Sequence, residues 1–145
     1  MKNFGLLIAA ILFLSGCANT GNKVTTITPL EAIKLSNQTA PQTVKGVFEL
    51  TVKGYYEKQR MEFLNSELDS KDQRNLIIAL RPQAVKELTD MYGQNPREFF
   101  MGKTIKVIGE AKRIKMWNTF KHRNLRNYYY QTQVFVNRAS QIKTI

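Results

Sequence analysis

The chain has 145 residues, of which 43% are hydrophobic, and a formal net charge of +11 at pH 7. This apolar content argues against intrinsic disorder and suffices for one domain with one core. Cys17 and His122 are the only cysteine and the only histidine, so the sequence has no ligand set for a zinc site and no support for a histidine-based catalytic triad.

The positive charge is concentrated in the last third of the chain. Residues 18–102 carry 11 Lys or Arg against 10 Asp or Glu, whereas residues 103–145 carry 10 Lys or Arg against Glu110 alone. Solubility does not require such an asymmetry. It predicts a positive face that is directed at an anionic partner.

The first 17 residues have the order of an export signal. Lys2 is followed by an apolar run from Phe4 to Leu14, and Ser15 and Gly16 are small residues directly before Cys17. The run is shorter than the roughly 18 apolar residues of a membrane-spanning helix. An ordinary secretory signal that precedes a chance cysteine is the alternative interpretation.

The tetrapeptide Leu14-Ser15-Gly16-Cys17 resembles the lipobox of bacterial lipoproteins. The resemblance implies cleavage before Cys17, a diacylglycerol on its thiol and an acyl chain, such as palmitate, on its new amine. Cys17 is then the lipidation site, and a membrane is a partner. Ala18 and Asn19 differ from the Asp that resembles an inner-membrane retention signal. In a two-membrane bacterium we therefore expect the outer membrane, facing the periplasm.

A short helix follows the polar stretch 18–27. Thr28 can cap this helix, Pro29 suits its first position, and Glu31 completes a capping box. Its apolar stripe ends near Ser36. The sequence thus predicts a signal peptide (1–16), a lipidated tether with a short helix (17–42) and a folded domain (43–145).

Apolar alternation with a period of two predicts a long half-buried strand over 43–53, and a shorter strand follows around 61–64. The segment 66–72 is polar turn sequence. Residues 76–80 are apolar on both faces, as in a strand that is covered on both sides. Helical spacing then predicts a helix over 83–92 that packs one stripe on the sheet, formed by Ala84, Val85, Leu88 and Met91.

The remaining elements are a turn or a single helical turn over 96–101, whose Phe residues close one end of the core, and two long strands. The first strand, 103–114, has a bulge predicted at Gly109, where its apolar phase shifts. A connector, 117–126, joins it to the last strand, 127–136. The chain is therefore expected to be mostly β with one or two helices.

The order strand, strand, strand, helix, strand, strand resembles the five-stranded OB-fold barrel, which has its helix between strands three and four. The segment from Gly102 to Gly109 also resembles the fourth strand of bacterial OB-fold domains. The resemblance covers roughly residues 43–140. It implies that the loop between strands four and five frames a ligand groove. A generic small β-barrel or sandwich with one helix is the alternative.

Aromatic and cationic side chains are interleaved in this connector and beside it. Cations neutralise phosphates, and aromatic rings stack on bases or sugars. The candidate site for an anionic ligand comprises Lys112, Arg113, Lys115, Trp117, Phe120, Lys121, Arg123, Arg126 and Tyr129. The alternative is a solvated hairpin tip in which Trp117 and Phe120 cover the end of the barrel.

Glu67, Asp69 and Asp72 form the one dense group of carboxylates, with Arg74 close by. Their spacing matches no metal loop, so we interpret the segment as a solvated turn and not as a nuclease-like site. The sequence has no G-x-S-x-G motif and no phosphate-binding loop. We therefore expect a protein that is not an enzyme and that needs no cofactor and no metal.

Taken together, these patterns predict an exported, membrane-anchored lipoprotein whose small β-barrel binds an anionic envelope component. Anionic lipid, lipopolysaccharide and acidic glycan are the preferred ligands, and nucleic acid ranks behind them because an exported protein meets it less often. The alternative function is an accessory subunit of an envelope assembly with an acidic protein partner. Binding that falls steeply with salt favours the first function, and a complex that survives moderate salt favours the second.

Overall fold

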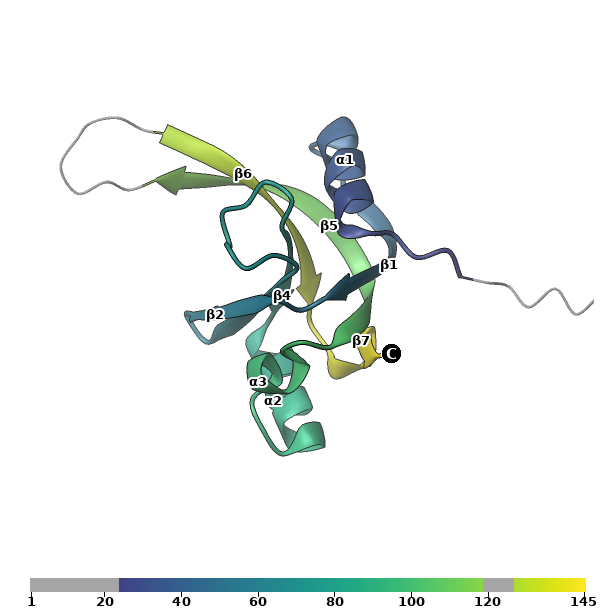
Figure 1. The fold of residues 1–145 in the computed structure, drawn as a ribbon, viewed down its shortest axis with the longest axis vertical. Coiled ribbons are helices and arrows are strands. Elements are labelled where there is room, and N and C mark those ends of the chain that lie inside the picture. The colour runs from purple at the N-terminus through teal and green to yellow at the C-terminus, as the bar shows by residue number, and fades with distance from the viewer. Residues whose placement is uncertain (1–23, 119–126) are drawn as a thin grey trace, which may run out of the picture.

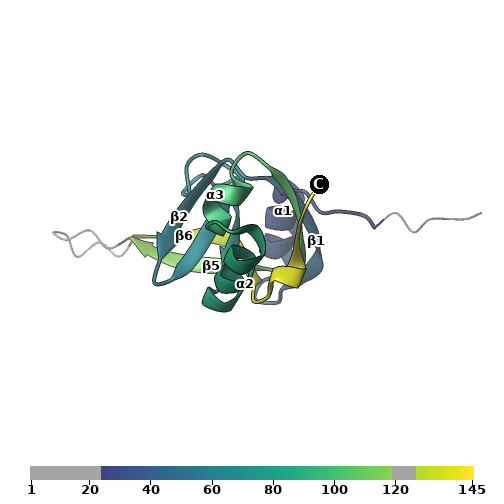
Figure 2. The same ribbon diagram turned by 90° about the horizontal axis from the view of Figure 1, so that it is seen from below.

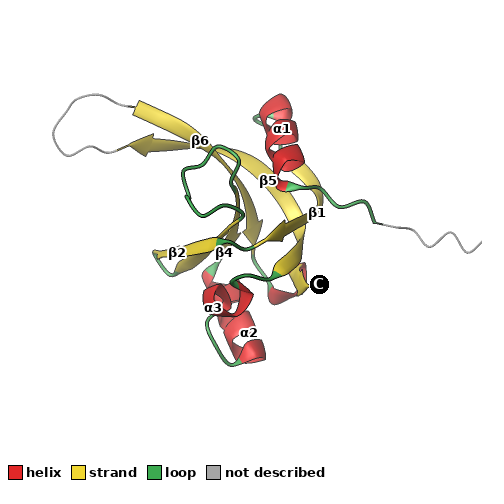
Figure 3. Cartoon of the chain, viewed as in Figure 1, coloured by secondary structure: helices red, strands yellow, loops and turns green. Residues whose placement is uncertain are grey.

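The structure is a computed structural model that describes residues 24–118 and 127–145. It is mostly β, with three short α-helices and a sheet of seven strands (Figures 1 and 3). In chain order the elements are α1 (Pro29–Thr39), β1 (Val44–Thr51), β2 (Gly54–Lys58), β3 (Met61–Asn65), β4 (Leu76–Leu80), α2 (Pro82–Tyr92), α3 (Pro96–Phe100), β5 (Thr104–Asn118), β6 (Asn127–Val136), a 3-10 turn (Ala139–Gln141) and β7 (Ile142–Thr144).

The strands pair in the order β1-β5-β6-β4-β3-β2, and β7 pairs with the beginning of β5. All pairs are antiparallel except β4 with β6. Only Val52 and Lys53 separate β1 from β2, and their backbone N–H groups donate to different parts of the sheet. The Val52 N–H donates to the carbonyl of Lys103, whereas the Lys53 N–H donates to the carbonyl of Asn65. The chain therefore passes from the β5 side of the sheet to the β3 side within one peptide unit.

The core lies between the sheet and the helices. Phe48, Leu64, Ile78, Ile105 and Val134 are fully buried in it, each from a different strand. All five residues of β4 are buried, which confirms that this strand is covered on both faces. Phe100 of α3 is buried in the same core, and Phe99 packs against it, so the prediction that these Phe residues close the core is confirmed.

Helix α1 has the predicted capping box, because the Glu31 N–H donates to the Thr28 hydroxyl and Glu31 accepts from the Thr28 N–H. The helix packs on the body of the protein, with Ala32 and Ser36 buried. Ile27, just before it, pairs with Phe48 of β1, and a Cβ added to Gly46 would lie 2.5 Å from the Ile27 side chain. The segment from Val24 to Gln42 is thus joined to the sheet.

Helix α2 confirms most of the predicted stripe. Ala84 and Leu88 are fully buried, and Val85 is partly buried against the core. Met91 was expected on the same face and is 61% exposed, so that part of the prediction is wrong. The helix ends at Tyr92, and the next residue, Gly93, adopts a φ of 70°. Tyr92 instead of Met91 completes the packing, with its ring centroid 3.8 Å from that of Phe99.

Two further details of the sheet differ from the sequence analysis. Strand β2 was not expected, and its residues pair with β3 from Gly54↔Asn65 to Lys58↔Met61. The bulge at Gly109 is absent, because β1 and β5 keep one continuous register through Gly46↔Gly109. Gly109 serves close packing instead, since a Cβ there would lie 2.9 Å from Val134 Cγ1.

Strands β5 and β6 extend beyond their neighbours. β1 pairs with residues 104–111 of β5, and β4 pairs with residues 132–136 of β6. Within the described chain, residues 112–118 and 127–131 have no strand partner outside the β5–β6 pair. They form a two-stranded ribbon, here called the ribbon arm, that projects from one side of the body (Figures 1 and 2). Val24, where the described chain begins, lies on the opposite side.

Candidate functional site

One face of the ribbon arm carries five aromatic and cationic side chains. Side chains alternate between the two faces of a strand, and the register pairs Lys115 with Tyr130 and Trp117 with Tyr128. These four residues therefore share a face with Arg113. We call this the aromatic–cation face, and its members are Arg113, Lys115, Trp117, Tyr128 and Tyr130.

The cations of this face lie on its aromatic rings. The Arg113 guanidinium carbon is 3.5 Å from the centroid of the Tyr130 ring. The Lys115 ammonium is 4.5 Å from the Trp117 ring and 4.0 Å from the Tyr128 ring. The rings meet edge to face, with centroids 5.7 Å apart for Trp117 and Tyr128 and 5.6 Å apart for Tyr128 and Tyr130. Cation–π attraction thus holds the charges in fixed positions without a carboxylate.

No carboxylate neutralises these cations. All 11 Asp and Glu residues of the chain fall within the residues that the structure describes. Among them, none forms an ion pair with Arg113, Lys115 or the neighbouring Lys112. Lower on the same strand, Lys106 does form an ion pair with Glu49, at 3.6 Å. Arg113 Nε is buried and finds no hydrogen-bond partner in the described chain.

The outer part of the face is amphipathic and exposed. Trp117 is 54% exposed and Tyr128 is 51% exposed, and the Lys115 ammonium lies against both rings. Such rings, which are apolar with one polar atom, favour the boundary between water and an apolar phase. The face therefore combines unneutralised charge with side chains suited to a membrane surface.

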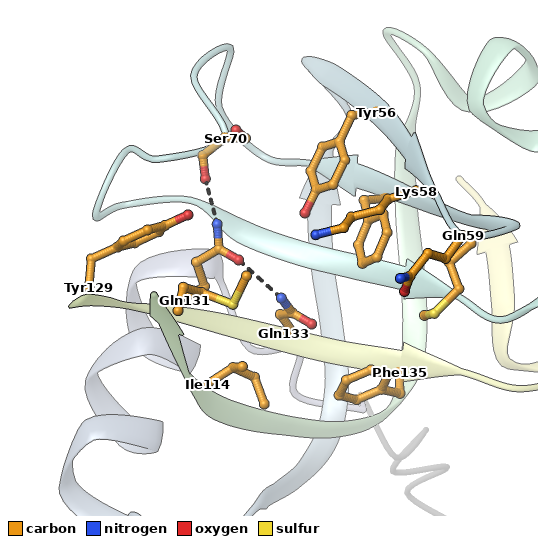
Figure 4. Close-up of a pocket in the computed structure, with 12 residues that line it drawn as sticks. Tyr56, Lys58, Gln59, Ser70, Ile114, Tyr129, Gln131, Gln133 and Phe135 are labelled. Atoms are coloured by element: carbon orange, nitrogen blue, oxygen red, sulfur yellow. Dashed lines mark hydrogen bonds between the residues drawn. The ribbon is translucent and has the colours of Figure 1, made fainter. Parts of the chain in front are cut away.

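The opposite face of the ribbon arm borders a groove of about 370 Å³ (Figure 4). Its floor includes Ile114 and Met116 of β5 and Tyr129 and Gln131 of β6. The β2–β3 hairpin forms a wall, where the Tyr56 and Phe63 rings stack with centroids 4.5 Å apart. In Figure 4 the Tyr56 hydroxyl and the Lys58 ammonium point towards the glutamine side chains across the groove.

The residues of the predicted site are divided between these two faces. Arg113, Lys115 and Trp117 lie on the aromatic–cation face, whereas Lys112 and Tyr129 lie on the opposite face of the ribbon. The other predicted members, Phe120, Lys121, Arg123 and Arg126, lie outside the described residues, as does Cys17. The candidate site predicted from the sequence did not include Tyr128 and Tyr130, because Tyr130 was expected in the core with Val134 and a stacking role for Tyr128 was the less favoured interpretation.

The carboxylates of the 66–75 loop have structural roles. Asp72 accepts hydrogen bonds from the backbone and side chain of Arg74, which lower the pKa of Asp72 to about 2. Asp69 accepts from the Lys71 N–H, and Glu67 forms an ion pair with Lys53 at 3.1 Å. Residues 24–118 and 127–145 contain no cluster of three or more His, Cys, Asp or Glu residues that could hold a metal ion.

Glu62 is a buried carboxylate that the sequence analysis did not single out. It is 3% exposed and accepts hydrogen bonds from the backbone N–H of Arg97, at 2.9 Å, and from Arg97 Nη1, at 3.3 Å. Arg97 also forms an ion pair with Glu57. Burial raises the pKa of Glu62, and Arg97 opposes this rise in part. The contacts anchor the beginning of α3 on β3, so we assign Glu62 a structural role.

The raised pKa of Glu62 predicts a pH dependence. The folded protein holds the Glu62 proton at pH values where the unfolded chain, with a pKa near 4.5, has released it. The free energy of unfolding of the wild type, relative to that of Glu62→Gln, will therefore fall as pH rises through and above the unfolded-state pKa. Urea unfolding of both proteins across this range measures the difference. A difference that stays constant or rises contradicts the assignment.

No protein-family model and no curated protein matches this sequence. Among solved structures, the chain superposes in part on a protein described as an aspartyl-tRNA synthetase from Leishmania major Friedlin, with a TM-score of 0.44 and 18% sequence identity. The match covers 88% of this chain and 22% of that protein. A TM-score of this size establishes neither a shared fold nor a shared function.

Proposed function

We propose that this chain is an exported lipoprotein whose small β-barrel binds the phosphate-bearing head groups of a membrane through the aromatic–cation face. The observation that carries the proposal is the pair Arg113 and Lys115, which is held on aromatic rings and has no carboxylate partner within the described chain. Lys and Arg near an anionic lipid surface each contribute about 1 kcal/mol to binding. Tyr and Trp side chains are enriched where proteins meet such surfaces.

The proposal includes an OB-like five-stranded barrel as the scaffold of the site. In this description β1 and β2 are the two halves of one bent first strand, followed by β3, β4, β5 and β6. The change of partners at Val52 and Lys53 supports it, because the two ends of the strand order are then joined by a continuous chain. The parallel pairing of β4 with β6 and the position of α2 between β4 and β5 also support it.

The anchor in this proposal is Cys17, on the strength of the lipobox resemblance. Each of the helices in 24–118 and 127–145 is too short or too polar to cross a membrane. The six residues from Ala18 to Lys23 reach at most about 20 Å when fully extended. A lipid on Cys17 would therefore hold the body close to the membrane surface.

Replacing the proposed lipid attachment site tests the anchor. Cys17→Ser will leave an exported protein that is unprocessed or soluble, because the hydroxyl does not take the place of the thiol in lipid transfer. Membrane fractionation with a radiolabelled fatty acid measures both properties. A Cys17→Ser variant that still takes up the label and sediments with membranes contradicts the proposal.

Vesicle sedimentation tests the binding function without the anchor. The chain from residue 17 onwards, carrying Cys17→Ser, will bind vesicles that contain phosphatidylglycerol and will not bind vesicles of phosphatidylcholine alone. Binding will fall steeply between 0.1 and 1 M salt, as the Debye length falls from about 10 Å to about 3 Å. Equal binding to both vesicles, or binding that salt does not weaken, contradicts the proposal.

A second candidate function is an accessory subunit that pairs with an acidic protein. The observation that favours it is the backbone of the ribbon arm, where residues 112–118 and 127–131 each leave one strand edge without a partner among the described strands. An extended segment of another protein can add to such an edge. A stoichiometric complex recovered from detergent-solubilised envelopes at moderate salt, together with no vesicle binding, would favour this function.

A further inference from the structure

The outer face of β5 and β6 is hollowed at more than one place, and the groove of Figure 4 is one of them. A second hollow, of about 620 Å³, has Ile108, Gly109 and Lys112 of β5 in its lining, together with Arg81 and Gln141. Ile114 and Phe135 line both hollows. The two hollows therefore adjoin at these side chains, and we call them together the ribbon groove.

The ribbon groove is long enough for a polymer. The residues of β5 that line it run from Met116 to Ile108, nine residues whose ends lie about 26 Å apart at the rise of a strand. The register places Met116 beside Tyr129, Ile114 beside Gln131 and Lys112 beside Gln133 along this floor. A compact small molecule would occupy one of the two hollows, whereas an extended chain could contact both.

The polar side chains of the groove include two buried amides and three cations. Gln133 Nε2 donates to Gln131 Oε1 at 3.0 Å, and Gln131 Nε2 donates to the carbonyl of Ser70 at 3.2 Å. This chain of bonds fixes both amides, and no donor in the described residues occupies Gln133 Oε1. Both side chains are almost fully buried, at 8% and 5% exposure, so they are held in place before any ligand arrives.

Three cations line the groove: Lys58 on its wall, Lys112 beside Gln133 on its floor, and Arg81, whose guanidinium carbon lies 4.9 Å from the centroid of the Phe135 ring. Within the described chain none of the three forms an ion pair. The one carboxylate in the lining, Glu110, is engaged by the Thr43 hydroxyl at 2.7 Å and by Lys45 at 3.5 Å. The groove therefore presents positive charges without a carboxylate partner in the described chain, next to neutral hydrogen-bonding groups.

We propose that the ribbon groove binds a linear acidic polysaccharide. Hydroxyl groups of sugar rings can both donate to and accept from the amides of Gln131 and Gln133, and carboxylates carried along such a chain can pair with the cations that line the groove. Single-stranded nucleic acid fits less well, because it carries a phosphate at every unit and needs free aromatic faces for its bases. Tyr56 and Phe63 are instead stacked on each other, at an interplanar angle of 7°. This inference goes beyond the membrane-binding function, because it concerns the opposite face of the ribbon.

Calorimetric titration with a hyaluronan octasaccharide, which carries one carboxylate on every second ring, tests this site. The Cys17→Ser chain will bind the octasaccharide, and Arg81→Gln with Lys112→Gln will weaken this binding about tenfold or more. Arg113→Gln with Lys115→Gln removes the same charge from the other face. This control will keep octasaccharide binding within about twofold and will lose vesicle binding, which separates the two sites.

Three results would overturn the inference. The first is no octasaccharide binding by the wild type, and the second is equal binding by the wild type and the Arg81→Gln, Lys112→Gln variant. The third is tighter binding of a thymidylate oligomer of similar length than of the octasaccharide. Gln133→Leu provides a further measurement, since it keeps the volume of the side chain, removes its polar atoms and should weaken octasaccharide binding without changing net charge.

Discussion

Replacing Arg113 and Lys115 together by glutamate will weaken binding to phosphatidylglycerol vesicles by well over tenfold at low salt. Each cation near an anionic surface contributes about 1 kcal/mol, and each reversal also adds a repulsion of similar size. A loss of about 1.4 kcal/mol already corresponds to a tenfold weaker affinity. Both side chains lie on the aromatic–cation face and have no carboxylate partner in the described chain, so their full charge is available to a ligand.

A matched control places the same charge change elsewhere. Lys86→Glu with Lys143→Glu alters α2 and β7, away from the ribbon arm, and should change vesicle affinity by about twofold or less. Thermal unfolding of both double variants shows whether the fold is intact. Because Arg113 packs on Tyr130, the neutral variant Arg113→Gln with Lys115→Gln also separates loss of charge from disturbance of the ribbon. A folded charge-reversal variant that binds like the wild type would contradict the proposed function.

Leu88→Ala will lower the free energy of unfolding by about 2–4 kcal/mol, because Leu88 is fully buried where α2 packs on the core. The truncation removes apolar contacts and leaves a cavity that the surrounding strands can fill only in part. The same change at Met91, on the same helix but 61% exposed, should cost less than about 0.5 kcal/mol.

Urea unfolding of the two α2 variants measures this difference directly. The comparison also tests the orientation of α2. The helical stripe in the sequence predicts that Leu88 and Met91 are both buried, whereas Met91 is exposed in the structure. Equal losses for the two variants would mean that α2 is rotated from its described position. A loss below about 0.5 kcal/mol at Leu88 would mean that the helix does not cover the core.

Sequence patterns predicted the elements whose burial is regular. The capping box at Thr28 and Glu31 marked the beginning of α1, and the continuous apolar run of β4 indicated burial on both faces. The sequence did not predict β2, because its five residues are one glycine, two tyrosines and two charged residues, and none of them is fully buried. Its position depends on the pairing with β3, which a local pattern does not contain. The shift of apolar phase near Gly109 has a tertiary cause, because Ile114 lines the ribbon groove outside the core.

The sequence predicted which types of residue form the candidate site, but it did not predict how these residues are divided between the two faces of the ribbon arm. Neighbouring residues along a strand point to opposite faces, so a cluster in the sequence such as Lys112 to Trp117 becomes two separate surfaces. Tyr128 and Tyr130 join Lys115 because β6 pairs with β5 in one particular register, and that register places Tyr129 in the ribbon groove. The burial of the glutamines at 131 and 133, and the bond from Gln131 to the Ser70 carbonyl, depend on segments distant in the sequence, so no local pattern indicates them.

The opposite placement of Val24 and the ribbon arm makes the body of the protein a spacer. A molecule held by a lipid next to its N-terminus and standing upright presents its arm to a second surface, one body length away from the first. A molecule that lies flat brings both ends to the same bilayer. The lipidated protein would cluster separate anionic vesicles in the first orientation and leave them dispersed in the second. The direction in which a ribbon of two strands leaves the body thus decides whether the protein joins two surfaces or lies along one.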